Sequence, residues 1–217
     1  MSAIVWLPQR ESCHLLVDAS SYFKTGVVER FLDKCRVIPE LHCAVTTLGP
    51  SLWQEIIFAA IRENFASFDE VKAGIEPLMS EVFEAHKGTI EWVHIATEVW
   101  VIGWSTRHDR PEGFTIFLED FDEYEKRRLV ENLGDRRPFE ARPISSVAVH
   151  VNPTPTAEKL FEAGWHTGVP ATDDLIPEID LLHLMEIQRR IPFESVGHSI
   201  CVGGYALLTS VDRNGVT

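Results

Sequence analysis

Short apolar runs separated by polar turns dominate the first fifty residues. Residues 4–7 and 13–17 are two such runs, and the polar segment between them predicts a β-hairpin that ends at Asp18. Residues 34–38 and 42–47 form a second pair of predicted strands. The segment that connects the two pairs is rich in small polar residues and is expected to be a loop.

After residue 50 the apolar positions recur at helical spacing. Ser51, with Gln54 three residues later, predicts a capping box at the start of a helix. A second helix is expected over residues 69–86, where Pro77 is expected to kink or break it. Two helices in succession therefore follow the predicted strands.

The rest of the chain alternates between strand-like and helical segments. Strands are predicted at residues 90–95, 98–104, 114–118, 144–151 and 205–211. Helices are predicted at residues 156–163 and 179–191. The densely charged stretch 120–137 is interpreted as a solvated helix and loop, and not as a binding tail.

Blocks of strands followed by blocks of helices favour an α+β fold with antiparallel sheets over a parallel βαβ fold. Two stacked sheets with helices outside would bury all the apolar faces, which predicts a four-layer αββα sandwich. The sequence has no internal repeat, low-complexity stretch or linker, so residues 1–217 are expected to form a single domain.

Composition narrows the possible partners. The chain has 45% hydrophobic residues and a formal net charge of −13, which argues against nucleic acid and anionic membranes as partners. No apolar run approaches the ~20 residues of a membrane span, and the start shows no signal-peptide pattern, so a cytoplasmic protein is expected. Four scattered cysteines are expected to be reduced, and neither cysteine nor histidine has metal-ligand spacing, so no metal or cofactor is expected.

The candidate chemistry lies at the start of the chain. Removal of Met1 would make Ser2 the N-terminus, with a hydroxyl nucleophile and a basic α-amine in one residue. A nearby ammonium such as that of Lys34 would lower the pKa of this amine by charge repulsion, and Asp18 would hold the lysine in place. The alternative interpretation is a frayed serine, a turn-forming aspartate and a solvated lysine.

These residues resemble the proteasome β-subunit group of N-terminal nucleophile (Ntn) hydrolases and the bacterial proteasome-like peptidase of the heat-shock ATP-dependent protease. Ser2, Asp18 and Lys34 match the family's nucleophile, aspartate and lysine in order and spacing. The resemblance implies that the backbone N–H of Leu48 or Gly49 forms the oxyanion hole.

The last part of the chain departs from the family's pattern. Ser199 stands where the family has an acidic residue, and Val202 stands where it has a serine that supports the nucleophile. Ser199 is kept as a candidate supporting residue. Asn152 or Thr154 lies in the region of a further supporting serine.

Three functions remain open at this point. The first is an amide hydrolase, for which the resemblance implies peptide substrates, a ring or other closed homo-oligomer and, by analogy only, an ATP-dependent unfoldase as partner. The second is a structural or assembly subunit without catalysis, which the departures at Ser199 and Val202 favour. The third is a small-molecule amidase on the same scaffold.

Two other groupings are interpreted as structural. Cys13 and His14 are adjacent on a predicted strand and should point to opposite faces, which argues against a catalytic dyad. Glu91 and Glu98, like the acids at 120 and 122, are interpreted as surface charges.

Overall fold

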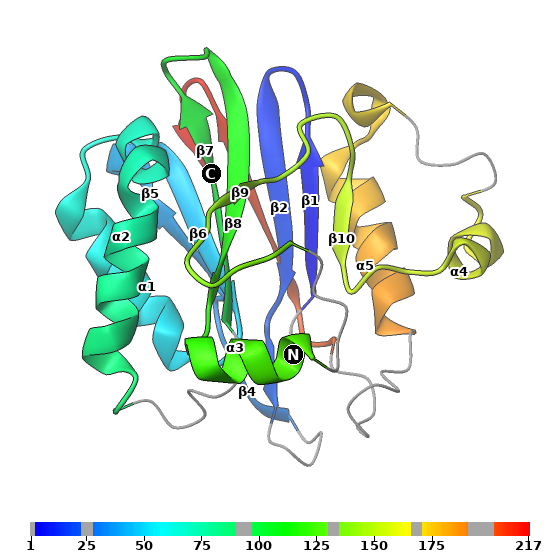
Figure 1. Cartoon of the computed structure of the whole chain (residues 1–217). Helices are drawn as coiled ribbons and strands as arrows, with labels where there is room; N and C mark the ends of the chain where they lie inside the picture. Colours follow the sequence, from blue (N-terminus) through cyan, green and yellow to red (C-terminus); the bar gives the residue numbers. More distant parts are fainter. Residues whose placement is uncertain (1–2, 23–27, 90–96, 130–134, 166–170, 191–201) are drawn as a thin grey trace.

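The computed structural model describes residues 3–22, 28–89, 97–129, 135–165, 171–190 and 202–217 (Figure 1). Every strand pairing in these segments is antiparallel, and no helix connects two parallel neighbouring strands of one sheet. The predicted α+β class is therefore confirmed.

The first sheet contains the N-terminal hairpin. Its strands follow the order β10-β1-β2-β11-β12. The bounds are β1 (Ile4–Pro8), β2 (Ser12–Asp18), β10 (His150–Asn152), β11 (Ala206–Asp212) and β12 (Gly215–Val216). The two central strands β1 and β2 are apolar almost throughout because both faces of this sheet are covered.

The second sheet has the order β5-β6-β7-β8-β9. Its strands are β5 (Cys35–Ile38), β6 (Cys43–Leu48), β7 (Thr97–Ser105), β8 (Arg110–Leu118) and β9 (Arg142–Pro143). The predicted strands here are confirmed, and β8 starts four residues earlier than expected because Arg110 already pairs with Ser105. The strand predicted at residues 90–95 lies outside the described residues.

A small two-stranded sheet lies between β2 of the first large sheet and β5 of the second in the chain order. It pairs β3 (Ser20–Tyr22) with β4 (Val28–Phe31), where the sequence predicted a loop. That prediction was wrong because β4 is exposed at every position, so its sequence carries no alternation of apolar and polar residues.

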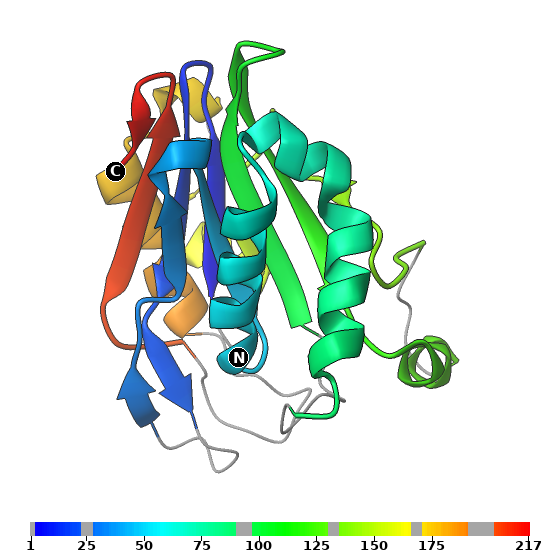
Figure 2. The same cartoon turned by 90° about the vertical axis from the view of Figure 1, so that its left-hand side faces the viewer.

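Helices cover the outer faces of the two large sheets (Figure 2). The described helices are α1 (Leu52–Asn64), α2 (Phe68–His86), α3 (Phe121–Arg128), α4 (Ala157–Glu162) and α5 (Leu182–Arg189), with short helical turns at Pro39–Leu41, Thr172–Asp174 and Pro177–Leu181. None of the helices among the described residues has the length and apolar character needed to cross a membrane.

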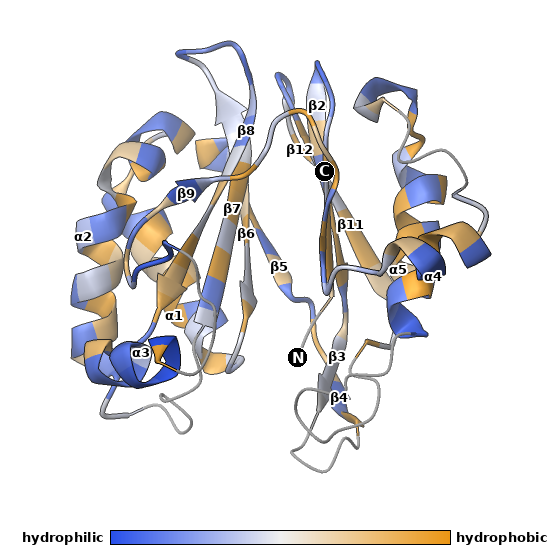
Figure 3. Ribbon diagram, turned by 45° about the vertical axis from the view of Figure 1, so that its right-hand side comes forward, coloured by the Kyte–Doolittle hydropathy of each residue, from blue (hydrophilic) through white to orange (hydrophobic). Residues whose placement is uncertain are grey.

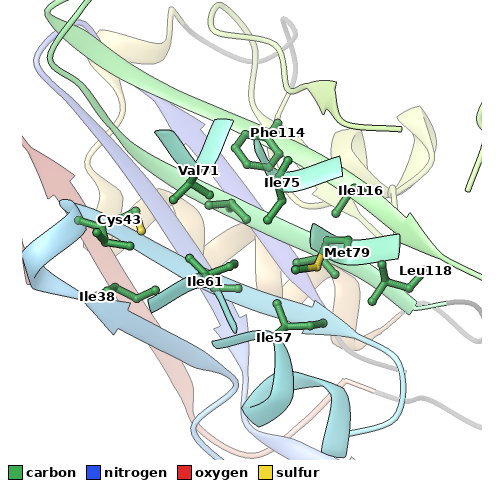
Figure 4. Close-up of a cluster of buried hydrophobic side chains, with 14 of the residues drawn as sticks. Ile38, Cys43, Ile57, Ile61, Val71, Ile75, Met79, Phe114, Ile116 and Leu118 are labelled. Atoms are coloured by element: carbon green, nitrogen blue, oxygen red, sulfur yellow. The ribbon is translucent and has the colours of Figure 1, made fainter. Parts of the chain in front are cut away.

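Apolar clusters hold these layers together. Figure 3 shows the two large sheets facing each other, with α1 and α2 outside one and α5 outside the other. Between the sheets, Trp6 and Leu15 of the first pack with Trp100 and Ile102 of the second. Under α1 and α2 a second cluster includes Ile57, Ile61, Val71, Ile75, Met79, Phe114, Ile116 and Leu118 (Figure 4).

Three local predictions need correction. The strand predicted over residues 144–151 is present only at its end, in β10. Pro77 lies inside an uninterrupted α2, because the face formed by Val71, Ile75 and Met79 is fully buried and offsets the lost backbone hydrogen bond. Ser51 adopts a helical backbone conformation and makes no capping hydrogen bond through its side chain, so the capping box is wrong.

Candidate functional site

Asp18 is the last residue of β2 and lies beside the first described residue of the chain. Its backbone N–H donates to the carbonyl of Ala3 at 3.2 Å, which extends the β1–β2 ladder beyond the pair Ile4 and Val17. The Asp18 side chain is completely buried. The hairpin therefore places a buried carboxylate at the point where the chain enters β1.

The carboxylate of Asp18 accepts hydrogen bonds from three segments. Its Oδ1 accepts from the backbone N–H of Ala3 and from Nζ of Lys34, each at 2.8 Å. Its Oδ2 accepts from the backbone N–H of Gly203 at 3.3 Å. These donors supply the partners that a buried charge requires, and they tie the start of the chain to its C-terminal part.

Lys34 directly precedes β5, an edge strand of the second sheet. Its carbonyl accepts a 2.6 Å hydrogen bond from Oγ1 of Thr46, and its side chain is only 8% exposed. Burial lowers the pKa of Lys34, and the charge of Asp18 opposes that shift. Among the described residues Asp18 is the only hydrogen-bond partner of Nζ, although an ammonium has three N–H donors.

The predicted oxyanion residues lie at the same end of the second sheet as Lys34. Cys35 pairs with Thr46, which places Lys34 close to Leu48, the last residue of β6. Gly49 follows with φ of +152°, and an added Cβ would lie 2.5 Å from Oγ1 of Thr97. Glycine is therefore required here for both backbone conformation and space.

Two predicted site residues, Ser2 and Ser199, lie outside the described residues, as does Met1. Of the two candidates for a further supporting residue, Thr154 donates through Oγ1 to the carbonyl of Val151, which is a local structural bond. Asn152, in contrast, makes a side-chain hydrogen bond to Glu98 of the other sheet.

Glu98 is a buried residue that the sequence prediction assigned to the surface. It is 7% exposed, and its Oε2 accepts a 3.2 Å hydrogen bond from Nδ2 of Asn152, so it connects β7 of the second sheet to β10 of the first. Burial raises its pKa. A usable signal existed, because Glu98 shares the strand face of Trp100 and Ile102, which lie between the sheets.

Glu98 and Asn152 also lie at the end of the sheets where the candidate site is found. Asn152 is opposite Ile4 in the β1–β10 pairing, and Glu98 is opposite Leu48 in the β6–β7 pairing. A carboxyl and a carboxamide therefore lie at the same end of the two sheets as the start of β1.

The pairing of Cys13 with His14 is structural, as the strand alternation predicted. Cys13 belongs to the cluster between the sheets. His14 contacts the side chains of Gln9, Ser12 and Ser210 on the other face. Burial raises the pKa of the Cys13 thiol, which argues against a reactive thiolate.

Comparison with known proteins adds no assignment to this geometry. We found no protein-family model and no curated protein that matches the chain. The arrangement itself places a buried aspartate and a buried ammonium with unused donors beside Ala3, and a glycine turn at the end of β6, the neighbouring strand of β5. Such a set can tune the pKa of an amine and stabilise negative charge.

Proposed function

We propose that the protein is an N-terminal-serine amide hydrolase in which Ser2, exposed by removal of Met1, is the nucleophile. The observation that carries the proposal is that one oxygen atom, Oδ1 of Asp18, accepts from both the Ala3 N–H and the Lys34 ammonium. A carboxylate in this position fixes the chain's start and the cation relative to each other.

Covalent geometry links this observation to Ser2. A peptide bond joins Ser2 to the nitrogen of Ala3, and this nitrogen and Nζ of Lys34 each lie 2.8 Å from the same oxygen. The two nitrogens are therefore no more than 5.6 Å apart, twice that distance. This distance ends at Ala3, and the α-amine of Ser2 lies one residue further along the chain, so the proposal requires that Lys34 come within ~4–6 Å of that amine, where a like charge lowers its pKa.

The proposed reaction has two halves. The hydroxyl of Ser2 attacks the substrate carbonyl while the free α-amine accepts its proton, and the N–H of Leu48 or Gly49 stabilises the oxyanion. The amine then gives the proton to the departing nitrogen, which leaves an acyl ester on Ser2. Water, deprotonated by the same amine, cleaves the ester and restores the serine.

The fold supports the same proposal at a coarser level. The two facing sheets with outer helices fit the four-layer αββα arrangement of the Ntn hydrolases. We extend the proposal to peptide substrates and to a closed homo-oligomer that encloses the sites. An ATP-dependent unfoldase as partner rests on analogy alone, and a small-molecule amidase is the variant in which the same site acts on a different amide.

A non-catalytic structural subunit is the second candidate. The replacement of the family's acidic residue by Ser199 and of its serine by the buried Val202 favours it. Under this alternative the Asp18–Lys34 pair would serve only to join the two sheets.

Two measurements separate these candidates. The intact mass of natively expressed protein should show loss of Met1, and a peptide-based electrophile should add to Ser2 with one label per chain. Ser2→Ala should abolish labelling and amide cleavage, whereas Ser80→Ala, which changes a hydroxyl on α2 away from the site, should leave both unchanged. Retention of Met1, or undiminished cleavage in Ser2→Ala, would refute the hydrolase.

A further inference from the structure

A polar cleft of about 380 Å³ lies where α3 meets the segment that leads into β9. Six residues line it: Tyr124, Arg128, Asp135, Arg137, Glu140 and Arg142. Its volume is at the small end of the range of about 300–1,000 Å³ typical of small-molecule sites. Three guanidinium groups in one cleft are notable in a chain with a net charge of −13.

The arginines differ in how far their charge is already compensated. Arg128 pairs with Glu125 at 3.4 Å, and Arg142 contacts Glu140 at 3.4 Å. Arg137 makes no ion pair and no side-chain hydrogen bond within the described segments. The cleft therefore contains a guanidinium whose donors are available.

Arg142 is the second arginine in the cleft whose N–H groups are only partly satisfied by hydrogen bonds. It donates to the carbonyl of Asp135, but its Nε is buried and has no hydrogen-bond partner among the described residues. A buried donor without a partner destabilises the structure unless something satisfies it. Arg137 and Arg142 thus both have N–H groups without a partner among the described residues.

We propose that this cleft binds a phosphate group, with Arg137 and Arg142 as its principal ligands. Guanidinium groups present paired N–H donors that match the spacing of phosphate oxygens, and such contacts are stronger than neutral hydrogen bonds. Arg128 supplies additional positive charge. The hydroxyl of Tyr124 already donates to the carbonyl of Arg136. Tyr124 therefore lines the cleft but is not a proposed phosphate ligand.

The two acids in the cleft limit which anion fits. Glu140 already engages Arg142, so the incoming group must compete with a carboxylate for that contact. A doubly charged phosphate does so better than a monoanion such as chloride or acetate. The small volume and the acidic remainder of the molecule disfavour an extended polyanion such as RNA.

This inference revises the interpretation of residues 120–137 and does not rest on the proposed hydrolase. The helix predicted there is present as α3, and Lys126 pairs with Glu123 as expected of a solvated face. Arg137 and Arg142, which follow α3 in the chain, differ from Lys126 because they line the cleft and do not pair along the surface of the helix.

The test is calorimetric titration of the full chain with inorganic phosphate at constant ionic strength. We expect saturable binding, and Arg137→Gln should weaken it about tenfold or more because a charge-assisted contact is lost. Arg137→Lys should bind with intermediate affinity, since it keeps the charge but not the paired donors. Arg10→Gln, an exposed arginine in another part of the fold, is the matched control and should change binding less than about twofold.

A parallel titration with AMP distinguishes the source of the phosphate. Tighter binding of AMP than of inorganic phosphate would support a phosphomonoester as ligand, and equal or weaker binding would support free phosphate. The melting temperature of Arg137→Gln without ligand should match that of the unchanged protein, because this side chain is exposed. Absence of saturable binding of both probes, or equal binding by Arg137→Gln, would overturn the proposal.

Discussion

Replacing Asp18 by asparagine should destabilise the protein strongly. The substitution keeps an acceptor for the N–H of Ala3 but removes the charge that faces Lys34, whose side chain is 8% exposed. Leaving one member of a buried ion pair uncompensated costs about 3–5 kcal/mol. Because typical domains are stable by only about 5–15 kcal/mol, this loss is a large fraction of the total.

Urea unfolding, with the free energy extrapolated to zero denaturant, measures the effect. Lys34→Met in the Asp18→Asn background removes the uncompensated cation, so the double variant should recover about 2 kcal/mol or more. Asp173→Asn changes an exposed ion pair and should cost less than about 1 kcal/mol. A loss below about 1 kcal/mol in Asp18→Asn, or no recovery in the double variant, would contradict the buried pairing.

Two further predictions concern the ends of β6 and β7. The pKa of Glu98 is raised from an ordinary value of 4.5, so the folded state binds its proton more tightly than the unfolded state. Its contribution to stability is therefore present below pH 4.5 and lost as the pH rises through the higher native pKa. Glu98→Gln should remove this part of the pH dependence in urea titrations from acid to neutral pH, and an unchanged profile would contradict it. Gly49→Ala should cost about 1–3 kcal/mol because of its φ and its contact with Thr97, whereas Gly88→Ala, with nothing within 4 Å of the added Cβ, should be nearly neutral.

The elements around the candidate site were the most predictable from sequence. The first hairpin has apolar runs on both strands, and Asp18 is the first charged residue after the second run, so its position at a strand end follows from the pattern. Lys34 is the first residue of the strand predicted over residues 34–38, and β5 begins directly after it. The contact between the two side chains was expected from the chemistry of an amine nucleophile and from the family resemblance, and not from the hydrophobic pattern, because it joins residues of two separate sheets or their ends.

Other features lack a local signal. The exposed β4 buries no side chain that would impose an alternation, and it is held to β3 by the backbone ladder and by a hydrogen bond from Oγ of Ser21 to Glu29. Residues 144–149 are apolar enough to resemble a strand, yet they pair with no strand in the described part of the chain. Glu98 departs from the surface position predicted for it because both faces of β7 are buried, so a charged residue within that strand is buried with its neighbours.

The location of the Asp18–Lys34 pair is an argument for function in its own right. A buried ion pair is not a strong source of stability, since apolar residues of similar volume often serve as well or better. Here the pair joins the end of β2 to the residue before β5, beside the start of β1, and its ammonium retains unused donors among the described residues. Stability alone does not require a lysine there, whereas tuning an adjacent amine does. The Asp18→Asn/Lys34→Met variant tests this directly, because it should fold well and yet lose the electrophile label on Ser2. A stable double variant that is still labelled at the normal rate would show that the pair has no role in the chemistry.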